Sequence, residues 1–227
     1  TPLTYAYDST LKECVNIFTA GDGTVCGYGE EDYPQAGWGM YLNAIFDESV
    51  VSVDNTRARG DATAKTFIEG GALDYIYKNI TCGDYLFVQF GHNDMRTDRP
   101  DMYLDASEGG AYERYLEVYI DTARAKGAVP VLVTPPALYA FDDAGSVINS
   151  LKPYAEAMQR VAARKAATVL DINTLTENAL NADAAAYADC YMSDGAGLTE
   201  TGAKLVCGFI GQQLAAVHSP LSGLIAQ

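Results

Sequence analysis

Four short stretches rich in glycine and polar residues lie at the carboxyl ends of predicted strands or in the loops beside them: Gly21-Asp22-Gly23-Thr24, Arg59-Gly60-Asp61, Gly91-His92-Asn93-Asp94 and Asp194-Gly195-Ala196-Gly197-Leu198. The first ends an apolar strand in a tight glycine turn that is predicted to feed a helix. Because open α/β folds place their sites where parallel strands end, the residue after Asp22 is the one that would carry a nucleophile. That residue is Gly23, which has no side chain, and the function of the chain depends on this absence.

The elements that must position these stretches alternate along the chain. Apolar runs predict strands over 14–20, 50–53, 84–90, 129–134 and 168–171, and helical spacing predicts helices over 38–46, 63–80, 112–126, 150–167, 175–188 and 199–217. Residues 1–13 read as a polar lead-in with partial strand character. The alternation predicts one α/β domain over residues 1–227, in which helices cover both faces of a central, mostly parallel five-stranded sheet.

Charge and composition exclude several classes of partner. The net charge is −15, so we expect neither nucleic acid nor an anionic membrane as partner, and strongly anionic polysaccharides are weakly disfavoured. There is no signal peptide and no run of about eighteen apolar residues, so we expect a soluble chain that is mature or excised from a longer one.

The cysteines and histidines argue against a metal site. The five cysteines form no CxxC pair and the chain has only two histidines, so we expect no metal and no cofactor. Cys14 and Cys82 precede strands that could be neighbours, and Cys190 and Cys207 flank one loop–helix unit. Five free thiols and one or two disulfides are equal alternatives, because spacing does not settle connectivity.

Five stretches, taken in order, resemble the SGNH (GDSL) hydrolase superfamily, and within it the rhamnogalacturonan acetylesterases and related polysaccharide deacetylases. They are Ala20-Gly21-Asp22-x-Thr24, Tyr33-Pro34-Gln35-Ala36-Gly37-Trp38-Gly39, Phe67-Ile68-Glu69-Gly70, the run from Gly83 to Asp94 that ends in Gln89-Phe90-Gly91-His92-Asn93-Asp94, and Leu198-Thr199-Glu200-x-Gly202-Ala203. The resemblance covers nearly the whole chain and implies a three-layer, flavodoxin-like fold.

The resemblance also implies roles for five positions. A serine nucleophile belongs at Gly23, and the backbone N–H of Gly60 and the side chain of Asn93 complete an oxyanion hole with the nucleophile's own N–H. An Asp-x-x-His pair belongs at Asp194 and Gly197, where the histidine acts as base. This sequence has glycine at both the serine and the histidine position.

Acyl transfer by this mechanism needs both missing groups, a hydroxyl that attacks and an imidazole that carries its proton. No other side chain is expected to take over these roles. Thr24 should point away from the site, and His92 is interpreted as a structural histidine bonded to backbone. Ser193 is interpreted as a turn residue, and His218 as a cap of the last helix. None of these restores a nucleophile–base pair at the required spacing. We therefore expect that the chain is not an enzyme, and that the ancestral activity was carbohydrate O-deacetylation.

The cleft that remains should bind a sugar through polar groups and aromatic faces. The predicted ligand contacts are Asp22, Asn93, Asp194, Tyr33, Tyr103, Tyr139 and Phe141. Trp38, by contrast, begins a helix and is expected in the core.

Three functions are compatible with these observations. The first is a non-catalytic carbohydrate-binding module on an esterase fold, serving a secreted system that degrades plant cell walls, such as a cellulosome. The acidic charge favours neutral hemicelluloses, for example xyloglucan or another β-glucan, as ligand. The alternatives are an engineered, inactive rhamnogalacturonan or xylan acetylesterase, and a structural or protein-docking domain. We expect a secreted monomer, part of a larger multimodular protein, that binds a polysaccharide or oligosaccharide.

Overall fold

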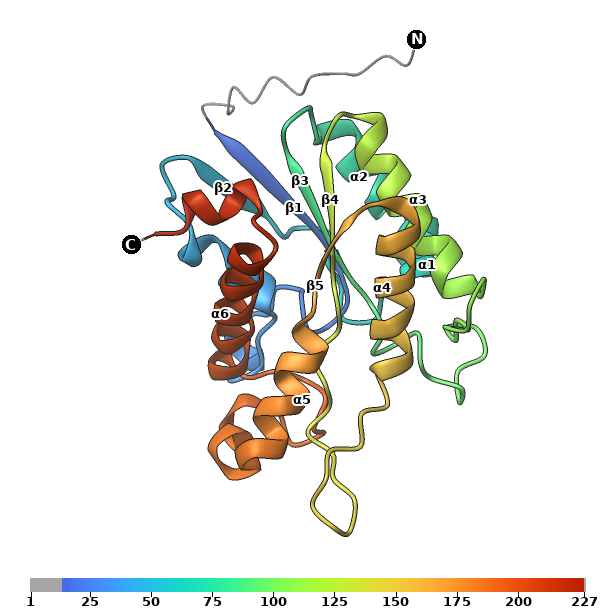
Figure 1. Ribbon diagram of the computed structural model, residues 1–227, viewed down its shortest axis with the longest axis vertical. Helices are drawn as coiled ribbons and strands as arrows, with labels where there is room; N and C mark the ends of the chain where they lie inside the picture. The colour runs from blue at the N-terminus through green and yellow to red at the C-terminus, as the bar shows by residue number, and fades with distance from the viewer. Residues whose placement is uncertain (1–13, 227) are drawn as a thin grey trace.

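A five-stranded sheet forms the centre of the computed structural model, which describes residues 14–226; the predicted lead-in over residues 1–13 lies outside the described residues. The strands are β1 (Val15–Gly21), β2 (Val51–Asp54), β3 (Tyr85–Gln89), β4 (Val129–Val133) and β5 (Thr168–Leu170). They lie in the order β2-β1-β3-β4-β5, and every neighbouring pair is parallel (Figure 1). The predicted five-stranded α/β fold is therefore confirmed.

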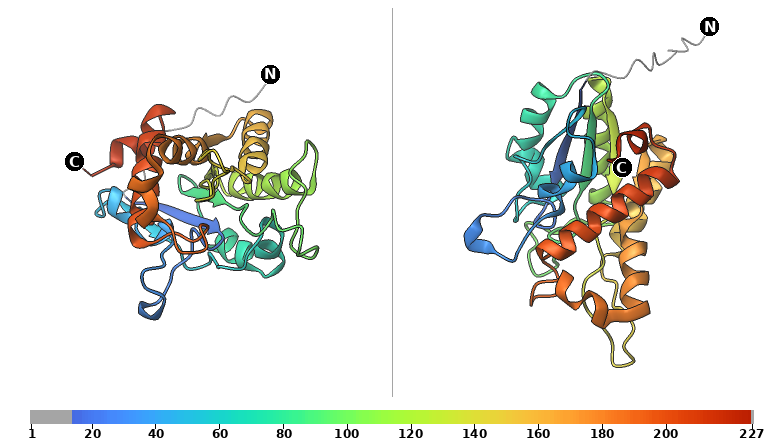
Figure 2. Two further views of the ribbon diagram at one scale, coloured as in Figure 1. Left: turned by 90° about the horizontal axis from the view of Figure 1, so that it is seen from below. Right: turned by 90° about the vertical axis from the view of Figure 1, so that its left-hand side faces the viewer.

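Helices cover both faces of this sheet, which explains why the strands read as nearly continuous apolar runs. The helices are α1 (Ala64–Glu69), α2 (Ala72–Asn79), α3 (Ala111–Ala125), α4 (Lys152–Lys165), α5 (Ile172–Asp183) and α6 (Glu200–Ala216). One core lies between the sheet and α1 to α4 and contains the mutually packed rings of Phe67, Phe90 and Tyr119. The other lies under α6, on the opposite face of the sheet (Figures 1 and 2), and contains Trp38 and Phe87.

The predicted helix over 63–80 is two helices in the structure. Gly70 ends α1, and Gly71 precedes α2 with a φ of +77°, a left-handed conformation that glycine adopts without steric cost. The helix predicted over 175–188 begins earlier, because the Asp171 carboxylate accepts a hydrogen bond from the Thr174 amide and caps α5. Its last residues form a separate 3-10 segment, Ala184–Cys190.

The region around Trp38 also differs from the prediction. Residues 38–46 form two 3-10 helices, Trp38–Met40 and Leu42–Ile45, rather than an α-helix. The backbone N–H of Trp38 donates to the Thr24 carbonyl (2.8 Å) and that of Gly39 to the Val25 carbonyl (3.1 Å). These amides are therefore satisfied by the chain that follows β1 and do not start a longer helix.

No α-helix directly follows β1, which corrects the predicted strand–turn–helix. The chain instead makes a turn in which the Val25 and Cys26 amides both donate to the Asp22 carbonyl at 3.0 Å. A loop and a 3-10 turn, Glu30–Asp32, come next. Gly23 therefore lies in a turn at the carboxyl edge of the sheet.

The five cysteines, all within the described range, are free, so the disulfide alternative does not hold in this structure. Among residues 14–226, no helix combines the length and the apolar character that a membrane crossing requires.

Candidate active site

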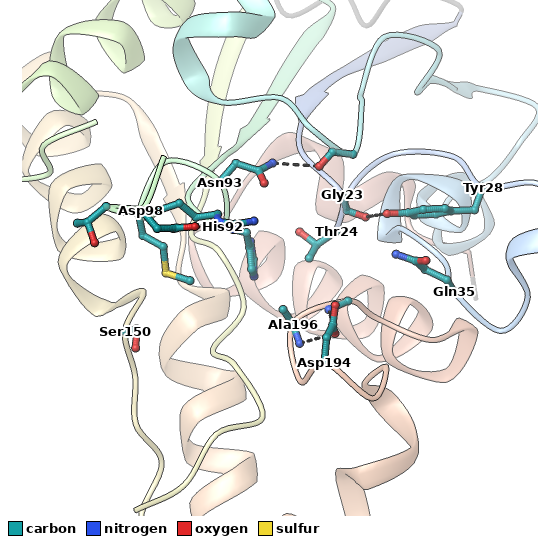
Figure 3. Close-up of a pocket in the computed structure, with 15 residues that line it drawn as sticks. Gly23, Thr24, Tyr28, Gln35, His92, Asn93, Asp98, Ser150, Asp194 and Ala196 are labelled. Carbon is teal, nitrogen blue, oxygen red and sulfur yellow. Dashed lines mark hydrogen bonds and ion pairs between the residues drawn. The ribbon is translucent and has the colours of Figure 1, made fainter. Parts of the chain in front are cut away.

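A cavity of about 600 Å³ lies at the carboxyl edge of the sheet. It is lined by all five positions that the resemblance singles out: Gly23, Gly60, Asn93, Asp194 and Gly197. They come from the loops after β1, β2 and β3 and from the loop before α6, so a parallel sheet brings together residues that are far apart in sequence. Figure 3 shows these loops facing one another around the cavity.

Asp22 lies beneath the cavity and does not line it. Its side chain is fully buried, and its Oδ1 accepts hydrogen bonds from the Thr24 amide (3.1 Å) and the Thr24 hydroxyl (2.9 Å). Burial alone would raise the pKa of this carboxyl, but neighbouring His92 and the hydrogen bonds from His92 and Thr24 outweigh burial and lower the pKa. The predicted ligand contact of Asp22 is thus incorrect, because its carboxylate is buried and accepts hydrogen bonds from residues of the protein interior.

His92 links this buried carboxylate to the cavity. Its Nδ1 lies 3.4 Å from Asp22 Oδ2, its backbone amide donates to the same oxygen at 3.4 Å, and its side chain is 11% exposed. The ring lines the cavity beside Asn93 (Figure 3). The predicted structural histidine bonded to backbone is therefore wrong: the partner of His92 is a carboxylate. Asp22 and His92 each lie two residues after a predicted strand, so the sequence did place both at the same edge of the sheet.

Two backbone amides on the cavity wall are free to bind an anion. Within residues 14–226, neither the Gly23 nor the Gly60 N–H donates to another protein group. The Asn93 side chain differs from its predicted oxyanion role, because its Nδ2 donates to the carbonyls of Gly60 (3.0 Å) and Ala62 (2.8 Å). Asn93 thus holds the Gly60 loop in place in this structure, and Gly23 and Gly60 supply the unpaired donors.

A neighbouring side chain lies close to each of the two glycines. A Cβ at Gly23 would lie 3.1 Å from the Tyr28 hydroxyl, which donates to the Gly23 carbonyl at 2.8 Å (Figure 3). Burial raises the pKa of Tyr28 well above its ordinary value, so the phenol stays protonated. A Cβ at Gly197 would lie 3.0 Å from Met192 Cγ and 3.4 Å from Gln35 Nε2. A serine or histidine side chain at these positions would therefore require a small shift of Tyr28 or Met192.

Asp194 shapes the loop on which it lies. Its Oδ1 accepts hydrogen bonds from the amides of Ala196 and Gly197, both at 2.9 Å. The α6 helix is capped instead by Thr199, whose hydroxyl accepts from the Gly202 amide. Asp194 remains on the cavity wall, where it was predicted.

Tyr139 and Phe141 support this loop from outside the cavity, which corrects their predicted contact with ligand. Their rings pack edge to face at 4.8 Å, and the Tyr139 ring also contacts Tyr191. The Tyr139 amide donates to the Gly195 carbonyl at 2.8 Å. The cluster therefore stabilises the backbone next to Asp194 and does not line the cavity.

Tyr33 and Tyr103 lie elsewhere too. Tyr33 is 74% exposed and does not line the cavity. Tyr103, 39% exposed, lines a second cavity of about 530 Å³. The two cavities share Met95 and Ser150, so they adjoin, and Tyr103 belongs to the same extended surface as the first cavity.

Trp38 is buried, as predicted, and is connected to the floor of the site. Its Nε1 donates to Gln89 Oε1 at 2.7 Å. Gln89 Nε2 in turn donates to the Thr24 hydroxyl and, at 3.4 Å, to Asp22 Oδ1. A continuous hydrogen-bonded path thus runs from the indole to the carboxylate beneath His92.

Asp94 is a second buried carboxyl at this edge of the sheet. Its Oδ1 accepts a hydrogen bond from the Ala64 amide at 2.9 Å, while its Oδ2 has no partner among the described residues. Burial raises the pKa of Asp94 to about 8 despite that hydrogen bond. The carboxyl is therefore largely protonated at neutral pH. In the same range, no group of three histidine, cysteine, aspartate or glutamate side chains is placed to hold a metal ion.

The chain matches the GDSL-like Lipase/Acylhydrolase family over residues 19–205. It is 35% identical over 167 residues to the rhamnogalacturonan acetylesterase RhgT of Bacillus subtilis, covering 74% of this chain and 68% of that protein. It is 38% identical over 157 residues to the probable rhamnogalacturonan acetylesterase YesY of the same species, covering 69% of this chain and 70% of that protein.

Solved structures agree with the fold. The protein YxiM of Bacillus subtilis superposes with a TM-score of 0.80 at 26% identity, covering 91% of this chain, which spans 58% of that longer chain. The fold is shared with the acetylxylan esterase Axe2 of Geobacillus stearothermophilus, with a TM-score of 0.68 at 15% identity. The superposition covers 90% of this chain and 95% of that chain.

These relatives correct one prediction made from the sequence. The expectation that the chain is not an enzyme is wrong on this comparison, because the matched relatives are named as acetylesterases, which points to an enzyme. The match over residues 19–205 and the parallel sheet lead to one conclusion: the chain belongs to the GDSL-like Lipase/Acylhydrolase family.

Proposed function

We propose that this chain is a carbohydrate O-acetylesterase that binds acetylated polysaccharide of the plant cell wall in the cavity beside Gly23 and releases acetate. The observation that carries the proposal is the pair of unpaired amides, Gly23 and Gly60, on the wall that also holds His92. Free N–H groups of this kind stabilise the negative charge that develops on an ester oxygen during hydrolysis. The names of the matched relatives support an acetyl ester as substrate.

The charges around the cavity favour a neutral polysaccharide. Arg96 is the only arginine or lysine among the described residues that line it, and Arg96 is paired with Asp98 at 2.8 Å. Asp194 adds a further carboxylate. A polyuronate would meet a net negative wall, so acetylated hemicellulose is the better substrate on electrostatic grounds.

The second cavity fits a polymeric substrate. It continues from the first through Met95 and Ser150 and carries Tyr103, whose exposed ring can stack on the apolar face of a sugar. Its three carboxyl groups, Asp105, Glu108 and Glu156, outnumber its one basic side chain, Arg160, and again favour an uncharged glycan. A chain of several sugar units can therefore lie along both cavities while one acetyl ester reaches the amides of Gly23 and Gly60.

Acetate release tests the proposal. The purified chain is incubated with acetylated xylan, acetylated xyloglucan and acetylated rhamnogalacturonan, and acetate is measured over time. We expect release from the neutral substrates above that from rhamnogalacturonan. Ala196→Trp is the matched control, since it adds a bulky ring to a cavity-lining position and should abolish release. Activity that persists in this variant reveals a contaminant, and absence of acetate from every substrate overturns the proposal.

A further inference from the structure

An ester hydrolase needs a nucleophile, and the hydroxyl groups near Gly23 are occupied with other partners. The Thr24 hydroxyl is buried and donates to Asp22, and the Tyr28 hydroxyl donates to the Gly23 carbonyl. In the described part of the chain, none of the hydroxyl groups on the cavity wall hydrogen-bonds to a histidine. A protein hydroxyl paired with a base, the arrangement that activates serine or threonine, is thus not assembled here.

One base does face the cavity. His92 has Asp22 on its Nδ1 side, and no described residue hydrogen-bonds to its Nε2. A carboxylate at Nδ1 favours the tautomer with the proton on Nδ1, which leaves a lone pair on Nε2. The aspartate is buried and held by Thr24 and Gln89 as well, so its position is fixed from both sides. This is the arrangement of a base and the carboxylate that orients it.

The hydrogen-bond donors for the reacting ester carbonyl lie on the same wall. Gly23 and Gly60 offer free amides, and Asn93, which follows His92 directly, fixes the Gly60 loop through its two hydrogen bonds. Because position 23 carries no side chain, a water molecule can stand close to an ester carbonyl that is bound by these amides.

We propose that His92 is the general base of this site and activates a water molecule that attacks the acetyl carbon directly, with Asp22 as the positioning residue. This inference rests on the proposed acetylesterase function. The water oxygen forms a bond to the carbonyl carbon while His92 Nε2 takes the water proton, and the charge on the carbonyl oxygen is held by the Gly23 and Gly60 amides.

Collapse of this intermediate completes the reaction. The bond between the acetyl carbon and the sugar oxygen breaks, and the protonated His92 returns its proton to that oxygen. One ester and one water give one acetic acid, which ionises, and one sugar hydroxyl. No covalent acetyl-enzyme is formed, which distinguishes this route from the one that a serine at position 23 would provide.

The experiment compares His92→Ala, His92→Gln and His218→Ala with the unmodified chain on the best acetylated substrate. Glutamine keeps a hydrogen-bond donor toward Asp22 but cannot take up a proton at neutral pH, so it separates loss of the base from loss of folding. His218, the other histidine, lies after α6 outside the cavity and is the matched control. We expect kcat to fall roughly 10²–10⁴-fold in both His92 variants and to stay unchanged in the control. Added imidazole should restore part of the activity of His92→Ala.

Two further readouts separate this route from its alternatives. Mass spectrometry of the quenched reaction should find no acetylated protein during turnover. Asp22→Asn should lower kcat while leaving KM unchanged, as expected of a group that orients the base. Activity retained in folded His92→Gln, or an acetyl adduct that forms and decays at the turnover rate, overturns the inference and leaves the acetylesterase function standing. An unmodified chain that releases no acetate overturns both.

Discussion

Asp94 offers a test of the electrostatics at this edge of the sheet. The carboxyl is buried, its Oδ2 has no partner among the described residues, and its pKa is raised to about 8. In the unfolded chain an aspartate ionises near pH 3.9, so between about pH 4 and pH 8 the unfolded state loses a proton that the folded state keeps. The folded state is therefore penalised progressively as the pH rises through this window, and above it the penalty is constant.

The size of this penalty follows from the shift. Each pH unit in the window lowers the free energy of unfolding by about 1.4 kcal/mol, which amounts to about 4 kcal/mol at pH 7 relative to a chain without this ionisation. Asp94→Asn removes the charge while keeping the shape of the side chain and an oxygen for the Ala64 amide. We expect the variant to gain stability relative to the unmodified chain as the pH rises, by an amount of that order.

Urea denaturation at several pH values between about pH 4.5 and pH 8.5 measures the effect. The quantity of interest is the difference in unfolding free energy between Asp94→Asn and the unmodified chain, because the contributions of the other carboxyl groups cancel in it. Asp101→Asn, which removes an exposed carboxyl paired with Arg99, is the matched control and should leave this slope almost flat. Parallel curves for Asp94→Asn and the unmodified chain would refute the assignment of a protonated, buried Asp94.

Two further substitutions test the packing. Gly23→Ser places a Cβ 3.1 Å from the Tyr28 hydroxyl, so it should lower the free energy of unfolding by about 1–3 kcal/mol, measured by thermal melting. The loss should be clearly smaller in a Tyr28→Phe background, and an equal loss in both backgrounds contradicts the contact. Glu113→Gln removes a buried carboxylate that is bound by Arg160 at 2.7 Å and Arg164 at 3.0 Å, both on α4. It should lower the free energy of unfolding by about 3 kcal/mol, measured by urea denaturation. The more exposed Glu117→Gln should cost far less, and comparable losses in the two variants would show that burial of Glu113 does not matter.

The sheet could be predicted because its signal is local. Buried parallel strands need apolar residues on both faces, so each of the five runs stands out against the polar loops that flank it. The predictions fail where a single residue or a contact with a segment distant in the sequence decides the conformation. Gly71 breaks a helix that apolar spacing had extended, and the amides of Trp38 and Gly39 are captured by a turn some fourteen residues earlier.

The candidate site was predictable only in part. The resemblance chose five positions, and the structure gathers all five around one cavity. The role of His92 depends on its distance from Asp22, which lies seventy residues earlier, and no spacing rule gives that distance. Aromatic residues in loops were a poor guide to the lining of the cavity, because Tyr139 and Phe141 contact each other and the backbone near Gly195.

The path from Trp38 through Gln89 to Asp22 gives the protein a built-in optical reporter. Trp38 is the only tryptophan of the chain, so the intrinsic indole emission comes from one known point beneath the site. Rearrangement of the Asp22–His92 pair on sugar binding would change the polarity around the indole ring and hence the wavelength of its fluorescence emission. Occupancy of the cleft can thus be followed in plain buffer, without a dye and without turnover.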